Sequence, residues 1–245
     1  MKPLIAIASC KRDCENGFNQ AIRDTWGKEA SMLASTLFFT GKDAGPQDKD
    51  VIELNCPDDY LGLPWKTYRI LEWALANGYS HIFKCDTDTY VRPRRMLKSN
   101  YHRHDYVGNF VGRKDNGRFL ARRGNTVGPT IVGVPRVVYE CLYSWASGGA
   151  GYWLSAKAAK YIMENPPDER AICPHLKYPC EDLWIGNLMG PQIKAGALTG
   201  VDDTRYGQSY RQDYRVIFTA HFCSEGKKRS FNTEWMHKHH QVNRQ

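Results

Sequence analysis

Two carboxylates separated by one residue follow an apolar segment of this 245-residue sequence. Asp86 and Asp88 flank Thr87, directly after HIFKC at 81–85 and before Tyr90 and Val91. Ligands of open α/β sheets bind beyond the carboxyl ends of the strands, which is where a strand over 81–85 would place both acids. Mg²⁺ and Mn²⁺ prefer carboxylate oxygens, and a metal held by one or two of them keeps positions open for a diphosphate. The pattern favours a metal and diphosphate site; the alternative is a solvated turn.

The run Gly148-Gly149-Ala150-Gly151 is the second segment that bears on chemistry. It lacks the Gly-Lys-Ser/Thr continuation of a P-loop. Because glycine lets a backbone approach a ligand closely, we expect this run to lie against a donor or an acceptor.

The elements that must position these residues alternate between strand and helix. Short apolar runs bounded by polar residues predict strands over 3–9, 33–39, 51–54, 81–85 and 105–111. Apolar residues at helical spacing predict helices over 18–28, 64–77, 155–163 and 181–189, with a glycine-rich basic loop over 112–133. This alternation indicates an α/β layer with a mostly parallel sheet. We expect one domain over 1–223, followed by a basic C-terminal tail over 224–245.

The positive charge of the chain, a net +8, is concentrated in one stretch. Residues 92–123 hold ten Lys or Arg and two Asp. Such a patch attracts nucleic acid or the phosphates of a small ligand, and the alternative is a solvated basic surface. The side chains expected to meet a DNA acceptor are Arg113, Lys114, Arg118, Arg122 and Arg123.

Five segments in order carry recognisable motifs. They are RDTWG at 23–27, the helix, strand and D-x-D segment at 63–91, GGAGYWLS at 148–155, EDLWIG at 181–186 and FTAHFC at 218–223. Together they resemble the β-1,3-glycosyltransferases of glycosyltransferase family 31, the group that contains the β-1,3-galactosyltransferases, the core 1 synthase and the Fringe enzymes. The resemblance covers most of the chain.

The resemblance implies a GT-A-type α/β fold with a Rossmann-like central sheet flanked by helices. It also implies a UDP-sugar donor, a divalent cation (Mn²⁺ or Mg²⁺) and inversion at the anomeric centre. Carried over position by position, Asp88 is the main metal ligand, Asp86 lies on the nucleotide side of the metal, and His221 adds a metal contact. Asp182 is the general base.

The remaining expected contacts divide between the nucleotide and the sugars. The nucleotide contacts are Asp86, Thr87, Asp88, Arg23 and Lys66, and the sugar contacts are Gly149, Gly151, Trp153 and Glu181. Several of the residues carried over have a plainer alternative. Asp182 is also the type of acid that stabilises a helix N-terminus. His221 is also typical of a core histidine, Arg23 and Lys66 suit surface ion pairs, and Trp153 suits a core as well as a sugar platform.

Three functions fit this pattern. The first is an inverting transferase that moves a hexose from a UDP-hexose to a hydroxyl of a glycan or protein, with β-linkage. The second keeps the donor but transfers the sugar to a hydroxymethylated base in DNA, which requires flipping that base out of the duplex. The third is a non-catalytic module that binds a UDP-sugar or carbohydrate.

The sequence shows no sign of export. No apolar run approaches the roughly 20 residues that a bilayer requires, and PLIAIAS at 3–9 is followed at once by Cys10, Lys11 and Arg12. We therefore expect no membrane anchor and a cytoplasmic enzyme of viral or bacterial type. The eight cysteines form no C-x-x-C pair and are expected to be mostly reduced, although Cys173 and Cys180 suit a disulfide in an exported protein.

Overall fold

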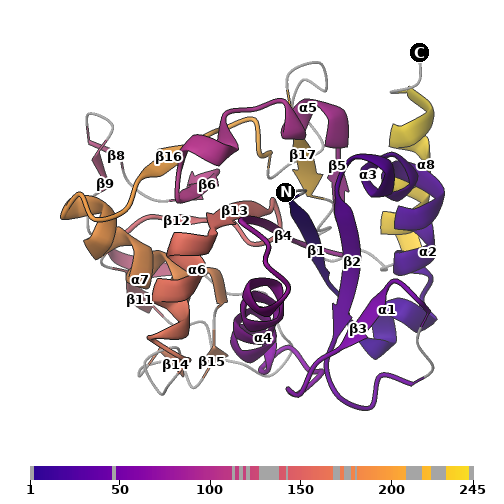
Figure 1. Ribbon diagram of the computed structural model, residues 1–245, viewed down its shortest axis with the longest axis horizontal. Coiled ribbons are helices and arrows are strands. Elements are labelled where there is room, and N and C mark those ends of the chain that lie inside the picture. The colour runs from indigo at the N-terminus through magenta and orange to yellow at the C-terminus, as the bar shows by residue number, and fades with distance from the viewer. Residues whose placement is uncertain are drawn as a thin grey trace.

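The structure is a computed structural model of the 245-residue chain (Figure 1). It describes residues 3–45, 48–111, 114–115, 118–119, 122–126, 138–141, 143–167, 172–173, 178–179, 181–207, 217–221 and 230–242. For 114–141, 172–179, 221, 230–232 and 242, the description within these ranges covers the backbone alone.

A seven-stranded sheet forms the centre of the protein, in the order β16-β6-β13-β4-β1-β2-β3. Its members are β1 (Leu4–Ala8), β2 (Ser35–Thr40), β3 (Val51–Glu53), β4 (His81–Asp86), β6 (Tyr106–Gly108), β13 (Tyr152–Ser155) and β16 (Gly200–Asp202). Strand β13 runs antiparallel to β4 and β6, and the other pairs are parallel. The predicted mostly parallel α/β sheet is confirmed.

Helices cover both faces of the sheet, as the alternating side chains of β1 show. Leu4 and Ala6 pack into a core with α4 (Leu63–Ala76), α6 (Ala156–Met163) and α7 (Glu181–Lys194). Ile5 and Ile7 belong to a second core, with α2 (Phe18–Ile22), α3 (Lys28–Leu33), α5 (Pro93–Leu97) and α8 (Ser230–Val242). Figure 1 shows α2, α3 and α8 grouped on one side of the molecule. Neighbouring residues of a strand point to opposite faces of the sheet. Because helices cover both faces, every residue of β1 is buried.

The remaining elements are short. They include α1 (Lys11–Glu15), the 3₁₀ turn Tyr101–Arg103 and five two-stranded ladders. The ladders pair β5 (Thr89–Val91) with β17 (Thr219–His221), β7 (Phe110–Val111) with β12 (Trp145–Ala146), β8 (Lys114–Asp115) with β9 (Arg118–Phe119), β10 (Arg122–Thr126) with β11 (Val138–Cys141), and β14 (Ile172–Cys173) with β15 (Tyr178–Pro179).

Several predicted elements differ from the observed ones. The helix expected over 18–28 continues to residue 33 through a π-helical segment (Arg23–Gly27), in which Thr25 has non-helical torsion angles. The strand expected over 105–111 is divided into β6 and β7, and α7 continues past residue 189 to Lys194 although Pro191 lies within it. The loop expected over 112–133 contains the short strands β8, β9 and β10, and the rest of it lies outside the described residues.

Helix α8 lies within the stretch expected to be a basic tail. Its Met236 is fully buried in the second core, and its His240 contacts Tyr90 of β5 through a hydrogen bond of 3.1 Å to Nδ1. The predicted domain boundary at 223 stays a prediction. Among the residues that the structure describes, no helix is both long and apolar enough to cross a membrane.

Candidate functional site

A cavity of about 960 Å³ opens beyond the carboxyl ends of β1 and β4. Strands β1 and β4 are parallel and pair Ala8 with Asp86, so the segments that leave both strands meet there. The loop before α4, the glycine-rich segment at 148–151 and the start of α7 complete the wall of the cavity. The lining residues are Ala8–Asp13, Glu15, Phe18, Asp58–Tyr60, Leu63, Lys66, Asp86–Asp88, Ser147–Gly149, Glu181 and Asp182.

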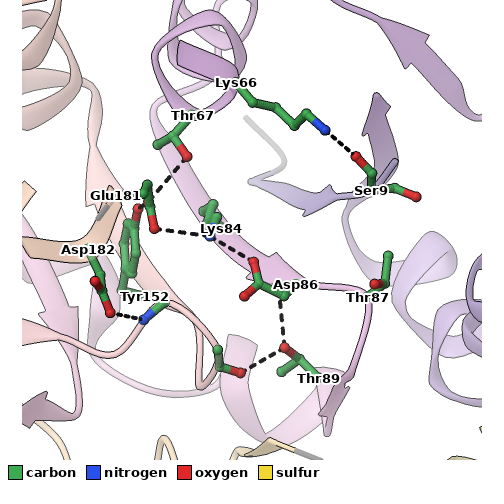
Figure 2. Close-up of polar contacts among 12 residues, drawn as sticks. Ser9, Lys66, Thr67, Lys84, Asp86, Thr87, Thr89, Tyr152, Glu181 and Asp182 are labelled. Carbon is green, nitrogen blue, oxygen red and sulfur yellow. Dashed lines mark hydrogen bonds and ion pairs between the residues drawn. The ribbon is translucent and has the colours of Figure 1, made fainter. Parts of the chain in front are cut away.

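The D-x-D segment is a turn held from both sides. Thr87 is buried, and its hydroxyl donates a hydrogen bond of 2.7 Å to the Asp13 carboxylate. The Asp86 backbone N–H donates to Thr89 Oγ1 at 3.2 Å, and that hydroxyl donates to the Gly149 carbonyl at 2.9 Å (Figure 2). Asp86 and Asp88 both line the cavity. These contacts fix the backbone that carries the two acids.

Asp182 lies in the first turn of α7 and lines the same cavity. Its Oδ2 accepts a hydrogen bond of 3.2 Å from the Gly148 N–H, and its Oδ1 accepts one of 2.9 Å from the Leu183 N–H. A Cβ at Gly148 would lie 3.0 Å from Glu181 Oε2, so glycine gives α7 room beside the glycine-rich segment. Asp182 therefore combines the helix N-terminal position of the plain alternative with a place on the cavity wall.

Glu181 is almost completely buried and is held by three elements. Its carboxylate accepts hydrogen bonds from Thr67 of α4 at 3.2 Å and from the Tyr152 hydroxyl of β13, and it forms an ion pair of 3.3 Å with Lys84 of β4. Burial raises the pKa of Glu181, and the positive charge of Lys84 opposes that rise. Glu181, which was predicted to contact a sugar, thus lines the cavity, while its carboxylate is bound to Thr67, Tyr152 and Lys84 inside the protein.

Lys84 is a charged residue next to this site that the sequence did not predict. Its side chain is fully buried and also forms an ion pair of 2.8 Å with Asp86 (Figure 2). Burial lowers the pKa of Lys84, but the charges of Asp86 and Glu181 outweigh burial and raise it overall. A lysine within the apolar run HIFKC was the signal in the sequence, since buried lysines are rare without charged partners.

The two basic residues expected at the nucleotide lie in different places. Lys66 lines the cavity, where its buried ammonium donates to the Ser9 carbonyl at 2.6 Å and to Asp58 at 2.8 Å. Arg23 does not line the cavity. It forms ion pairs with Asp48 and Asp50 and lies over the Phe38 ring, which is the surface ion pair of the plainer alternative.

Of the residues expected at the sugars, Gly149 lines the cavity, whereas Gly151 and Trp153 do not. Trp153 is 1% exposed and is stacked on Tyr101, so it is a core residue rather than a sugar platform. The physical reason is the alternation along β13, a strand that the sequence did not predict. Tyr152 faces Glu181, and its neighbour Trp153 faces the opposite core.

Gly151 has a conformational role that leads to a prediction. Its φ is +79°, and a Cβ there would lie 2.4 Å from Cζ of Phe83, whereas Gly196 has a φ of +75° with open space around it. We expect Gly151→Ala to lower the free energy of unfolding by about 2–4 kcal/mol, from backbone strain and overpacking together. Gly196→Ala should cost about 1 kcal/mol from strain alone. Urea denaturation monitored by circular dichroism measures the free energy of unfolding of both variants. Equal losses in the two variants would contradict the predicted clash with Phe83.

A cation fits the donor set of the cavity. Eight carboxylates and three cationic side chains line it, in a protein whose net charge is +8. Among the described side chains, no group of three His, Cys, Asp or Glu is arranged to hold a metal. Strand β17 pairs His221 with Thr89 in backbone register, beside the D-x-D turn, but the His221 side chain lies outside the described residues. Hard oxygen donors such as Asp86 and Asp88 suit Mn²⁺ or Mg²⁺ that a diphosphate also ligates.

The basic residues expected at an acceptor fall where the description is incomplete. Arg113 lies outside the described residues, and Lys114, Arg118, Arg122 and Arg123 are described by backbone alone, in β8, β9 and β10. Their role stays a prediction. Among the described cysteines, Cys10, Cys14, Cys56 and Cys85 are free thiols; Cys180 and the side chain of Cys173 lie outside the description.

Two curated proteins are similar to this chain in sequence. The human N-acetyllactosaminide β-1,3-N-acetylglucosaminyltransferase 2 is 24% identical over 76% of the chain and 50% of its own length. The mouse β-1,3-galactosyltransferase 1 is 25% identical over 97% of the chain and 76% of its own length. The chain therefore spans half the length of one relative and about three quarters of the other.

The fold is shared with a solved glycosyltransferase. The crystal structure of a glycosyltransferase involved in the glycosylation of the major capsid of PBCV-1 superposes with a TM-score of 0.50 at 14% identity, covering 96% of this chain and all of that one. The architecture is of the GT-A type. The galactosyltransferase family model matches residues 19–192, which include the D-x-D turn, the glycine-rich segment and Asp182. The chain belongs to the galactosyltransferase family, and its relatives transfer sugars in β-1,3 linkage.

Proposed function

We propose that this protein transfers a hexose from a UDP-sugar to a hydroxyl of a glycan or protein, with inversion and with the help of Mn²⁺ or Mg²⁺. The observation that carries the proposal is that Asp86, Asp88 and Asp182 line one cavity, although they come from two elements almost a hundred residues apart. Figure 2 shows Asp182 and Asp86 on two sides of Lys84. The names of the relatives suggest galactose and N-acetylglucosamine as the first donors to test.

The divalent cation is assigned to Asp88, with Asp86 and His221 contributing. Bound there, it would stabilise the negative charge that develops on the departing diphosphate, a contribution of several kcal/mol. The acidic wall supports this assignment, because a diphosphate is repelled by eight carboxylates unless a cation lies between them.

Asp182 is proposed to activate the acceptor. The acceptor oxygen forms a bond to C1 of the sugar while the bond from C1 to the diphosphate breaks, and the hydroxyl proton passes to the Asp182 carboxylate. A single displacement converts an α-linked donor into a β-linked product. The hydrogen bonds from the Gly148 and Leu183 N–H groups hold the carboxylate in place.

Transfer is tested by UDP release from a panel of UDP-galactose, UDP-N-acetylglucosamine and UDP-glucose with Mn²⁺, with and without N-acetyllactosamine. We expect one donor to release UDP, the acceptor to accelerate release, and EDTA to abolish it until Mn²⁺ is restored in excess. Release that persists in EDTA would contradict the metal assignment. No release from any donor, with UDP still bound, would instead favour the non-catalytic module.

A hydroxymethylated DNA acceptor is the second candidate, favoured by the charge of residues 92–123. In the same assay, duplex DNA containing 5-hydroxymethylcytosine replaces the sugar acceptor. If DNA is the acceptor, its affinity falls steeply with salt because phosphate contacts release counterions. DNA that leaves UDP release unchanged, at low salt as well, would remove this candidate.

A further inference from the structure

Lys84 places a positive charge in the middle of the central sheet. It lies on β4, paired with Ala6 of β1 on one side and with Tyr152 of β13 on the other, and its side chain is 0% exposed. A charge taken out of water is costly unless it is paired and hydrogen-bonded. The chain therefore keeps an ammonium at a position where its neighbours Phe83 and Cys85 are apolar.

The partners of Lys84 belong to the two halves of the proposed site. Its Nζ lies 2.8 Å from Oδ1 of Asp86, which follows two residues later on the same face of β4. The same Nζ lies 3.3 Å from Oε2 of Glu181, the residue directly before Asp182. One ammonium thus connects the strand that leads into the D-x-D turn with the first turn of α7.

The other contacts of Glu181 make this connection stiff. Its Oε1 accepts from Thr67 and Tyr152, while its Oε2 lies 3.0 Å from where a Cβ of Gly148 would be. The start of α7 is thereby fixed to α4, β4 and β13 together. Asp182, which accepts from the Gly148 N–H, takes its place on the cavity wall from that arrangement.

We propose that Lys84 is a positioning residue that holds Asp86 and the start of α7 in mutual register, so that the nucleotide side and the acceptor side of the cavity are aligned. This inference rests on the proposed transferase function. Because Oδ1 of Asp86 is paired with Lys84, the ammonium fixes the orientation of a carboxylate that lines the cavity. Loss of the ammonium leaves two carboxylates without their shared cation, and both are expected to move.

Lys84 could also serve only to stabilise the fold. A double variant separates that structural role from the positioning role. Lys84→Met removes the charge at similar length and leaves Glu181 buried without a cation, so stability should fall. Adding Glu181→Gln neutralises that carboxylate while an amide oxygen remains for Thr67 and Tyr152, so stability should return. Asp86 stays without its partner in the double variant. In the double variant we therefore expect the stability of the protein to return, while Asp86 and the start of α7 stay out of register.

The experiment compares wild type, Lys84→Met and the Lys84→Met/Glu181→Gln double variant. Three readouts are the melting temperature, Mn²⁺-dependent UDP affinity by calorimetry, and kcat and KM for the donor. We expect the double variant to regain the melting temperature but to bind UDP with Mn²⁺ about 10–100-fold more weakly than wild type, with kcat lowered by a similar factor. Lys157→Met is the matched control, since Lys157 is exposed, donates to the Ala197 carbonyl and lies outside the cavity.

Two results would overturn the inference. A double variant with wild-type stability, UDP affinity and kcat would show that Lys84 serves only to neutralise Glu181. A Lys84→Met variant with wild-type kcat and UDP affinity would show that no alignment depends on it. Failure of the proposed function has a separate signature, because the wild-type protein would then transfer no sugar from any UDP-sugar, whether or not it binds UDP with Mn²⁺.

Discussion

Asp182→Asn is expected to lower kcat for sugar transfer by about 10²–10⁴-fold, the range typical of losing a general base. Affinity for UDP with Mn²⁺ should remain within about threefold of wild type, because the nucleotide is assigned to the D-x-D side of the cavity. An amide is nearly the same shape as a carboxylate and can still accept from the Gly148 N–H, so α7 keeps its place. What the amide cannot do near neutral pH is take up the acceptor proton.

The measurement for Asp182→Asn is single-donor UDP release with acceptor, beside calorimetry of UDP binding. Asp203→Asn is a suitable control, since Asp203 is paired with Arg205 and lies outside the cavity. A variant that transfers sugar at the wild-type rate would exclude Asp182 as the base. A variant that has lost both transfer and UDP binding would indicate a structural defect instead.

Asp88→Asn should act on the other half of the reaction. We expect Mn²⁺-dependent UDP affinity to fall by at least ~100-fold, above the roughly 10–100-fold that follows from losing a partner outside the metal's direct ligands. The reason is that an amide offers the metal a neutral oxygen in place of a charged one. Transfer should fall with binding, and added Mn²⁺ should recover part of it.

Calorimetric titration of UDP at several Mn²⁺ concentrations checks this second prediction. Glu53→Gln supplies the control, because Glu53 is an exposed carboxylate of β3 that does not line the cavity. If Asp88→Asn bound UDP with unchanged dependence on Mn²⁺, the metal would have to be assigned to other residues. The two variants together distinguish loss of proton transfer from loss of the nucleotide.

The predictable part of the site is the part that is local in sequence. Asp86 and Asp88 were placed at the end of a strand because an apolar run precedes them, and the structure has β4 there. Asp182 was identified by resemblance, since nothing in EDLWIG alone separates a base from an acid at a helix start. The mostly parallel sheet followed from alternating periodicities, which are also local.

The rest depended on contacts between distant segments. The Lys84 and Glu181 pair joins residues 97 apart, and no periodicity reveals such a pairing. The role of Trp153 was left open between core and sugar platform, because β13 follows a glycine-rich run and was not identified as a strand, so the face of each side chain was unknown. Helix α8 was missed because residues 224–245 were judged by the charge of the whole stretch, although Met236 supplies the helix with a buried anchor.

The strand order has a consequence for how the protein is made. Strand β4 obtains its neighbour β13 only after residue 155 is synthesised, and β5, next to the D-x-D turn, obtains its partner β17 only at residue 221. At about 5–20 residues per second, roughly 7–27 s separate translation of Asp86 from that of His221. During that interval the nascent chain carries its acidic turn without β17, the strand that pairs with β5 beside it. A product truncated before residue 181 therefore retains the D-x-D motif but lacks Glu181 and Asp182 of the cavity wall.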